Sequence, residues 1–285
     1  MNVVDQLAKD KENVAILVDL TYAFEGIASL RVSQTKARVA QSTKFFNQLW
    51  SIYKLLKVEE EFNFGRTQNY SQLIDKELFI IITAEGGFSG DIDLKLVNLM
   101  SESYQPEQHD IIVIGYHGAI QLAQRGIDYV KYFKLPVNDQ NINVQPMLNE
   151  IQKYKKTTIY FQQYITLMNQ EVKKIDLTEA IRTNVVAETE NTISERNYIF
   201  EPNTHQVASH LERSMIQITL SQLILSSKLA QFASRFKAMN ISNQLASDQK
   251  QSLTLALNRA RRSLKDQRLR EIVNAYARSQ IGAVN

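Results

Sequence analysis

Residues 84–90, Ala-Glu-Gly-Gly-Phe-Ser-Gly, are the part of the chain that most resembles a ligand-binding loop. The glycines follow a short apolar, β-rich run and precede a helix-like stretch, which is how phosphate-binding loops are built. However, no Lys-Ser or Lys-Thr follows the last glycine, the spacing is not that of a dinucleotide fingerprint, and Glu85 would repel a phosphate. We therefore favour a tight structural turn, with nucleotide binding as the alternative.

Metal-binding chemistry is also weakly indicated. Glu85, Asp91 and Asp93 lie close enough in sequence to suggest a cation site, but they do not match a calcium-binding loop. Among the histidines, only the five-residue step from His205 to His210 resembles a metal-ligand spacing. These patterns favour ordinary loop and surface residues, and we predict no metal site.

Nucleophilic catalysis has little support in the sequence. His117 and Ser89 could be imagined as an acyl-transfer pair, yet no orienting third group and no oxyanion hole can be identified. The chain has no cysteine, which excludes a disulfide framework, thiolate metal ligands and thiol catalysis. We predict no catalytic residue and no cofactor.

The elements that would hold these residues alternate between strand-like and helix-like segments. Strand-like runs are expected at 78–83, 110–114, 129–134 and 157–165, and helices at 91–103, 119–125 and 145–153. Such alternation predicts a small, mainly parallel sheet with flanking helices. Residues 198–200 could add an edge strand.

Two long helical arms flank this middle part. All four prolines, and all glycines except Gly26 and Gly282, lie between residues 65 and 202. As one helix, residues 203–281 would measure roughly 120 Å at about 1.5 Å per residue, several times the diameter of a small domain. Their apolar residues recur every three or four positions, which places them on one helical stripe. They are Leu211, Met215, Ile218, Leu225, Leu229, Phe232, Phe236, Met239, Ala246, Leu253, Leu257, Ala260 and Leu264.

The N-terminal arm, residues 6–57, has a matching stripe, so the two arms most simply pair as an antiparallel coiled coil. One heptad register joins Val32, Thr35, Val39, Ser42, Phe46, Leu49, Tyr53 and Leu56. A shifted stripe, formed by Leu17, Leu20, Phe24, Ile27 and Leu30, predicts a stutter earlier in this arm. Charged Lys250 and polar Gln222 and Asn243 interrupt the C-terminal stripe. They indicate either helix ends and solvent-facing positions or segments that leave the partner helix.

The predicted fold class is therefore α/β plus coiled coil. Long antiparallel terminal helices (1–58 and 203–285) would flank a small Rossmann-like, mainly parallel α/β domain (59–202). The net charge of +3 is too small to argue for nucleic acid. No apolar run approaches the roughly 20 residues that span a bilayer, and the N-terminus lacks a signal-peptide pattern. We expect a soluble chain without a direct membrane span.

Basic residues gather in the last third of the C-terminal arm. They are Arg259, Arg261, Arg262, Lys265, Arg268 and Arg270. Positive charge in the second half of a helix complements the helix dipole, which is the simpler interpretation. The alternative is a basic surface that faces an acidic partner.

The C-terminal arm also carries family motifs. Ser227-Lys228, Ala233, Arg235 and Ala238-Met239 follow an S-K…A-x-R-x-x-A-M pattern. Residues 253–261, Gln267 and 271–273 follow L-T-L-x-x-N-K-A-R…Q…E-I-V, and residues 198–202 follow Y-x-F-E-P. On these motifs the chain resembles the gamma subunit of F-type ATP synthases, the central rotor shaft.

Three further segments resemble the family more loosely and in the same order. Residues 20–29 are similar to I-T-K-A-M-x-M-V-A-S, residues 83–93 to S-S-D-R-G-L-x-G-x-x-N, and residues 114–118 to I-G-x-K-G. The chain departs from the pattern at 10–13, where a basic tract is missing, and at 240–246, where two acidic residues are missing.

The resemblance implies a non-catalytic subunit of a rotary ATPase, peripheral on the cytoplasmic face of a membrane. Its coiled coil would turn in a ring of alternating alpha and beta subunits, and its foot would meet an epsilon-type subunit and a membrane c-type ring. The implied partner contacts are Arg259, Arg261, Arg262, Gln267, Arg268, Arg235, Met239, Thr21 and Glu25. The competing interpretations are a homodimeric coiled-coil scaffold with an α/β binding module and an independent nucleotide-binding enzyme.

Overall fold

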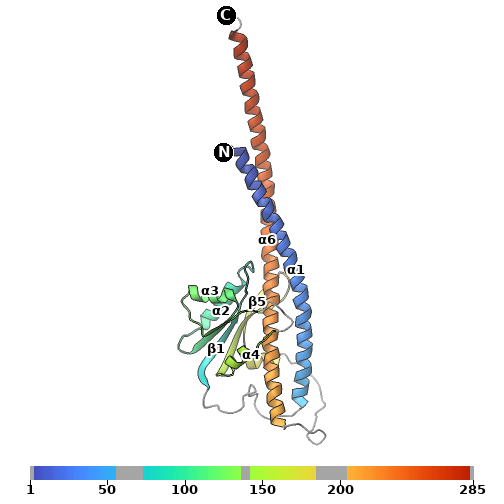
Figure 1. Cartoon of the computed structure of the whole chain (residues 1–285), viewed down its shortest axis with the longest axis vertical. Coiled ribbons are helices and arrows are strands. Elements are labelled where there is room, and N and C mark those ends of the chain that lie inside the picture. Colours follow the sequence, from blue (N-terminus) through green and yellow to red (C-terminus); the bar gives the residue numbers. More distant parts are fainter. Residues whose placement is uncertain (1–2, 56–72, 136–141, 184–203, 283–285) are drawn as a thin grey trace. The chain divides into compact units, whose positions relative to one another are not determined.

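The computed structural model describes residues 3–55, 73–135, 142–183 and 204–282 (Figure 1). Its two longest elements are the helices α1 (Val3–Leu55) and α6 (Thr204–Gly282). The chain divides into two compact units, one of Met1–Gly26 with Ala238–Asn285 and one of Ile27–Lys237. The helices α1 and α6 contribute to both units. The predicted domain boundaries at 58/59 and 202/203, and the predicted strand at 198–200, fall outside the described residues.

A five-stranded sheet forms the centre of the larger unit. Its strand order is β3-β2-β1-β4-β5. The strands are β1 (Ile74–Ile82), β2 (His109–Ile114), β3 (Lys131–Phe133), β4 (Tyr154–Tyr164) and β5 (Gln170–Asp176). The first four run parallel to their neighbours, as predicted, whereas β5 pairs antiparallel with β4. The sequence analysis missed β5, because its alternating pattern is dominated by charged residues.

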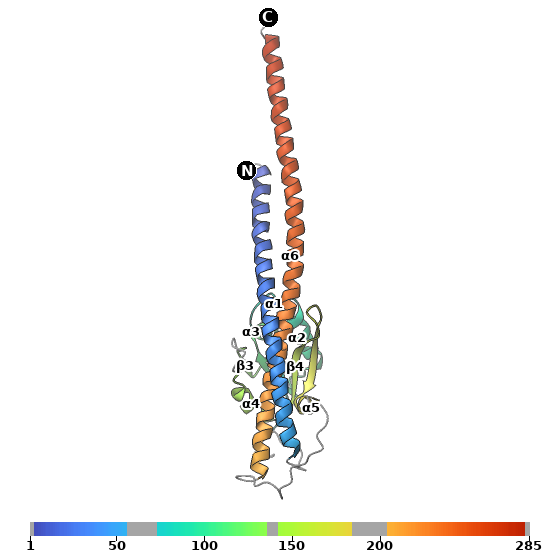
Figure 2. The ribbon, with the colours of Figure 1, turned by 90° about the vertical axis from the view of Figure 1, so that its right-hand side faces the viewer.

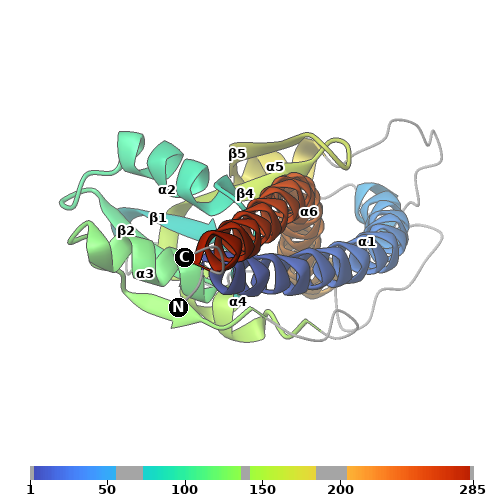
Figure 3. The same ribbon diagram turned by 90° about the horizontal axis from the view of Figure 1, so that it is seen from above.

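Helices cover both faces of this sheet, which explains its nearly continuous apolar strands. On one face, Phe79, Ile81 and Val113 pack against α2 (Ile92–Ser103) and α3 (Tyr116–Gln124). On the other face, Ile80 and Ile112 pack against α4 (Gln145–Ile151), α5 (Leu177–Thr183) and α6. Figure 3 shows α2 and α3 on the opposite side of the sheet from α6.

In the larger unit, helix α6 is buried on two sides. Met215, Ile216 and Leu220 are fully buried in the cluster that covers the sheet, whereas Leu229 and Ala233 pack against Val32 of α1. The heptad stripe predicted only the contact with α1. Of these sheet-facing residues, Met215 belongs to the predicted stripe. Ile216 and Leu220 were missed because they lie between the heptad positions, and only a second packing surface makes those positions part of the core.

Within each unit, the segments of α1 and α6 run antiparallel, as predicted (Figure 2). In the smaller unit, Asn240 Nδ2 donates to Glu25 Oε1 over 2.9 Å, and Asn243 Nδ2 donates to Thr21 Oγ1 over 3.0 Å. In the larger unit, Gln222 Nε2 donates to Thr43 Oγ1 over 2.7 Å. Gln222 and Asn243 therefore neither face solvent nor leave the partner helix, so both interpretations suggested by the sequence are wrong for these two residues. They hydrogen-bond across the helix pair.

The predicted stutter in the N-terminal arm is wrong. Thr21, Ala28 and Val32 are buried at 6%, 1% and 7% exposure, so one heptad register continues through this part of α1. The large apolar residues that suggested a shifted stripe lie on a different face and are exposed. Their exposed fractions are 48% for Leu17, 48% for Leu20, 39% for Phe24, 56% for Ile27 and 59% for Leu30.

The polar pair in the smaller unit gives a prediction about stability. Thr21→Val and Asn243→Ala will each lower the free energy of unfolding by about 1 kcal/mol, because each removes the side-chain hydrogen bond between the two helices. The double variant Thr21→Val/Asn243→Ala will cost less than the sum of the two single changes, because the shared hydrogen bond is lost only once. Denaturant unfolding of the four proteins checks this coupling. Strict additivity would show that the hydrogen bond contributes nothing to the pairing.

Among the residues that the structure describes, one helix meets the length and composition of a membrane span. An 18-residue window within Val3–Ser51 has a mean hydropathy of 1.3, and 11% of that window is buried. This differs from the expectation based on continuous apolar runs, because the apolar residues of α1 are interspersed with small and polar ones. A core helix of a soluble protein or a signal sequence near the N-terminus passes the same test, so this finding alone is weak evidence for a span.

Candidate functional site: the joint between the α/β domain and α6

The loop that joins β1 to α2 lies at the carboxyl end of the parallel strands, where ligand sites of open α/β sheets are found. It is packed tightly against the turn that follows β2. Thr83 Oγ1 donates to the carbonyls of Ile114 and Gly115 and accepts from the Gly118 amide at 2.9 Å. Gly115 has φ +99°, and a Cβ there would lie 2.1 Å from the Thr83 carbonyl oxygen. Only glycine fits this position.

Glu85 fastens this loop to two neighbouring elements. Its carboxylate accepts hydrogen bonds from the backbone amides of Tyr116 and Leu135, both at 3.2 Å, and from the Tyr132 hydroxyl at 3.1 Å. Burial, followed by the bond to Glu85, raises the pKa of Tyr132. The carboxylate in the middle of the loop thus accepts hydrogen bonds from the chain's own amides and from a tyrosine hydroxyl. This geometry supports the interpretation of the segment as a structural turn.

A buried polar network begins at Asp93, the second residue of α2. Asp93 is 3% exposed and accepts hydrogen bonds from the Ala84 amide at 3.2 Å and from Gln162 Nε2 at 2.8 Å. The other end of the Gln162 amide faces α6, where its Oε1 accepts from Ser227 Oγ and from Gln231 Nε2 at 3.3 Å. The network therefore links α2 through β4 to α6.

Arg235 of α6 holds the loop from its other side. Its Nε donates to the Gly87 carbonyl over 3.1 Å, and its Nη2 donates to the Gly86 carbonyl over 3.2 Å and to Ser89 Oγ over 3.3 Å. The preceding Ser234 donates to the Ser89 carbonyl over 2.7 Å. Burial lowers the pKa of Arg235, and the charge of Asp93 opposes that effect. We call the contacts of 84–90, Asp93 and Gln162 with Ser227–Arg235 the α6 joint.

The residues considered for catalysis have different partners. Ser89 Oγ accepts from Arg235, whereas His117 Nδ1 lies 3.3 Å from Asp93 Oδ2. From the sequence, no group was expected to orient His117 and Asp93 was considered only for a cation site, so this pair was not predicted. Within the parts of the chain that the structure describes, no three His, Cys, Asp or Glu residues come together as a metal site.

The residues expected to contact partners fall into two groups. Arg259, Arg261, Arg262, Gln267 and Arg268 are all exposed on α6. The remaining four are engaged within the chain. Met239 is 6% exposed, Thr21 and the half-buried Glu25 bond to α6, and Arg235 bonds to the loop. No partner chain is present to test these contacts, so they remain predictions.

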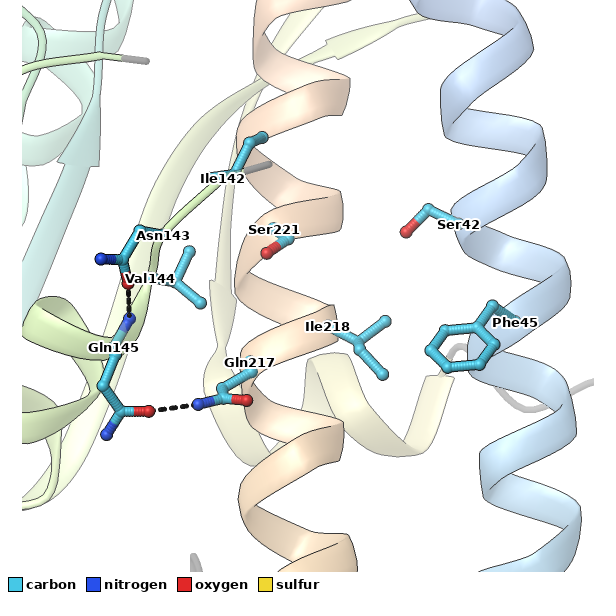
Figure 4. A pocket seen from close by; sticks show the side chains of 9 residues that line it. All are labelled: Ser42, Phe45, Ile142, Asn143, Val144, Gln145, Gln217, Ile218 and Ser221. Atoms are coloured by element: carbon cyan, nitrogen blue, oxygen red, sulfur yellow. Dashed lines mark hydrogen bonds between the residues drawn. The ribbon is translucent and has the colours of Figure 1, made fainter. Parts of the chain in front are cut away.

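A cavity of about 460 Å³ lies between α1, α6 and the start of α4 (Figure 4). Gln217 donates to Gln145, whose backbone amide donates to Asn143 Oδ1 over 3.1 Å. The residues that line the cavity are Ser42, Phe45, Ile142, Asn143, Val144, Gln145, Gln217, Ile218 and Ser221. None of these is ionisable, so the cavity offers no acid, base or charged anchor.

Comparisons with known structures find this combination of helix pair and α/β domain. A chain of the Euglena gracilis mitochondrial ATP synthase OSCP/F1/c-ring assembly, in rotational state 3, has a TM-score of 0.70. It is 13% identical, and the match covers 98% of this chain and 95% of that chain. A chain of the Tetrahymena thermophila mitochondrial ATP synthase central stalk and c-ring has a TM-score of 0.56 and 16% identity. The match covers 78% of this chain and 98% of that chain. The shared fold is thus that of two long helices flanking a small, mostly parallel sheet.

Sequence comparisons extend the likeness beyond the fold. A family profile described as ATP synthase matches residues 11–277. The ATP synthase gamma chain of Mycoplasmoides gallisepticum is 23% identical over 96% of this chain and 99% of its own length. The ATP synthase gamma chain of Clostridium botulinum is 22% identical over 92% of this chain and 93% of its own length. This chain belongs to the ATP synthase gamma-chain family. The gamma chain is a non-catalytic component of the ATP synthase complex.

Proposed function

We propose that this chain is the central rotor shaft of an F-type rotary ATPase and couples rotation to ATP synthesis or hydrolysis at the catalytic beta subunits. The observation that carries the proposal is the exposed apolar stripe of α1, Leu17, Leu20, Phe24, Ile27 and Leu30. A helix that leaves this much apolar surface uncovered needs an enclosing partner. A ring of alternating alpha and beta subunits around the helix pair would cover it.

The coupling we propose works through contacts that differ with angle. A shaft whose faces differ stabilises a different state of the surrounding ring at each orientation, and that difference in free energy is the coupling. The surface of this chain is uneven in the required sense. Apolar residues are exposed on the N-terminal part of α1, whereas exposed arginines follow one another from Arg259 to Arg270 on α6.

Individual residues receive different roles in this proposal. Arg259 and Gln267 would contact a catalytic beta subunit, and Arg261, Arg262 and Arg268 would face acidic loops of the ring. Glu25, which is half-buried, would contact the ring while it holds α6. Thr21 and Met239 would act by fixing the helix pair, because little of either side chain is exposed.

The α/β domain is the proposed foot of the rotor. It would meet an epsilon-type subunit and a membrane c-type ring, so that the chain would be peripheral to the membrane on its cytoplasmic face. Torque would pass between this foot and the helix pair through the α6 joint. The joint suits that task, because its buried hydrogen bonds connect α6 to two different elements of the α/β domain, the β1–α2 loop and β4.

Co-purification followed by mass measurement of the intact complex tests this function. The rotor predicts one copy of this chain for three alpha–beta pairs. A self-sufficient homodimer bound to other proteins would instead indicate a coiled-coil scaffold with an α/β binding module. Binding of ATP or NAD by the purified chain, without alpha and beta subunits, would indicate an independent enzyme.

A further inference from the structure

A histidine that no role described so far requires contacts Asp93 of the α6 joint. His117 lies in the first turn of α3, and its backbone amide donates to the Ala84 carbonyl over 3.0 Å. Its side chain is 30% exposed, whereas the Asp93 side chain that faces it is 4% exposed. The imidazole can therefore exchange protons with solvent while it touches a buried carboxylate.

The Asp93 carboxylate connects His117 to α6, so a change in the protonation of the imidazole can affect the contacts of α6. It holds the first residue of the loop through the Ala84 amide, and it holds Gln162 Nε2, whose other end bonds to Ser227 and Gln231. Gln162, Ser227 and Gln231 carry no charge. A continuous set of contacts therefore leads from the imidazole of His117 through Asp93 and Gln162 to α6.

The charges around His117 come from three elements. Asp93 of α2 and Glu85 of the loop are acidic, and Arg235 of α6 is basic. The hydrogen bond to Asp93 raises the pKa of His117, and burial and Arg235 oppose that shift. Farther along the loop and α2, Asp91 is paired with Lys95 at 2.8 Å and feels the charge of Lys237. The Tyr132 hydroxyl of β3 is bonded to Glu85.

We propose that His117 and Asp93 form a proton-operated latch, in which protonation of the imidazole tightens the α6 joint and its deprotonation loosens the joint. An imidazolium adds coulombic attraction to the hydrogen bond with the Asp93 carboxylate, which a neutral imidazole lacks. With imidazolium in place, Asp93 is held more firmly, and so are the loop and the Gln162 side chain that it orients. The latch is a property of this chain alone. Only its consequence for a rotor, a joint whose stiffness depends on pH, rests on the proposed function.

The sign of the pH dependence follows from the direction of the shift. Because folding raises the pKa of His117 above its ordinary value of 6.5, the stabilisation is complete below that value. It is lost as the pH rises through the raised pKa. The joint should therefore be tight in mildly acidic solution and loose in mildly basic solution.

Amide hydrogen exchange on the full-length chain tests the latch, with rates corrected for the intrinsic effect of pH. In the unmodified chain, protection of amides in 84–90 and 227–235 should fall several-fold between pH 6 and pH 8.5. His117→Lys, which keeps a positive charge, should remain protected at both values. His117→Gln should show the lower protection at both.

His109→Gln is the matched control, because His109 belongs to the opposite end of β2, where it stacks on Phe79. It should leave the pH dependence of the joint unchanged. The same pH dependence in His117→Gln as in the unmodified chain would overturn the latch. Both substituted residues are partly exposed, so the variants should fold, and the result does not depend on whether the chain turns in a ring.

Discussion

Replacing Arg259, Arg261 and Arg262 together by glutamate will lower the ATP turnover of a complex reassembled with alpha and beta subunits tenfold or more. All three side chains are exposed on α6, and among the described residues none of them forms a salt bridge. Reversing a charge that faces an acidic partner replaces attraction by repulsion. At about 1 kcal/mol for each site, three sites exceed the roughly 1.4 kcal/mol that corresponds to a factor of ten.

The matched control keeps the charge and changes the group. Arg259→Lys/Arg261→Lys/Arg262→Lys should retain most of the turnover if charge dominates, and lose it if bidentate guanidinium contacts are required. The assay should measure turnover and rotation over a range of salt concentrations, because contacts between exposed charges weaken with salt. Unchanged turnover and torque in the glutamate variant would contradict a ring-facing role. The basic cluster would then serve only to complement the helix dipole.

Gly115→Ala will destabilise the α/β domain by about 3 kcal/mol or more, enough to abolish the joint. Its φ of +99° with ψ of 143° is a conformation that essentially only glycine adopts, at a cost of about 1–3 kcal/mol for other residues. In addition, the new Cβ would lie 2.1 Å from the Thr83 carbonyl oxygen. Relieving that overlap must move β1 or the β2–α3 turn, which costs a further 1–3 kcal/mol or so. Denaturant unfolding of the full chain measures the loss.

Substitutions at two other glycines distinguish the backbone strain of a positive φ from the steric overlap of the new Cβ. Gly126 also has a positive φ, of +67°, but nothing lies within 4 Å of its Cβ position, so Gly126→Ala should cost about 1 kcal/mol. Gly87 has neither feature, and Gly87→Ala should change stability by less than about 0.5 kcal/mol. If Gly115→Ala cost no more than Gly126→Ala, the close approach to Thr83 would be unimportant.

The sequence predicted the local elements well, because each carries its own pattern. The parallel strands are runs of large β-branched residues such as Ile80–Ile82 and Ile111–Ile114, and both long helices lack prolines and show a heptad stripe. The family motifs, which occur in the same order as in the gamma-subunit family, then indicated that the two helical arms and the α/β segment belong to one known fold. The sequence did not predict β5, because an edge strand rich in charged residues, Gln170–Asp176, has no apolar signature.

The register of the helix pair was harder to predict. Leu17, Leu20 and Phe24 are the most apolar residues of the early part of α1, and a rule that buries apolar side chains places them in the seam. The structure instead buries Thr21 and Ala28. The apolar-stripe rule assumes that the partner is a single helix, whereas this segment carries a second apolar surface.

The sequence by itself determined the four parallel strands, the two long helices, their antiparallel pairing and the family, because periodicity and ordered motifs are local properties of the chain. Only the tertiary structure decided which polar residues meet. Asp93, His117, Gln162 and Arg235 are far apart in sequence, and the parallel sheet brings them together at its carboxyl end beneath α6. Their contacts depend on strand order and on the crossing of α6, and neither leaves a periodic signal in the residues themselves.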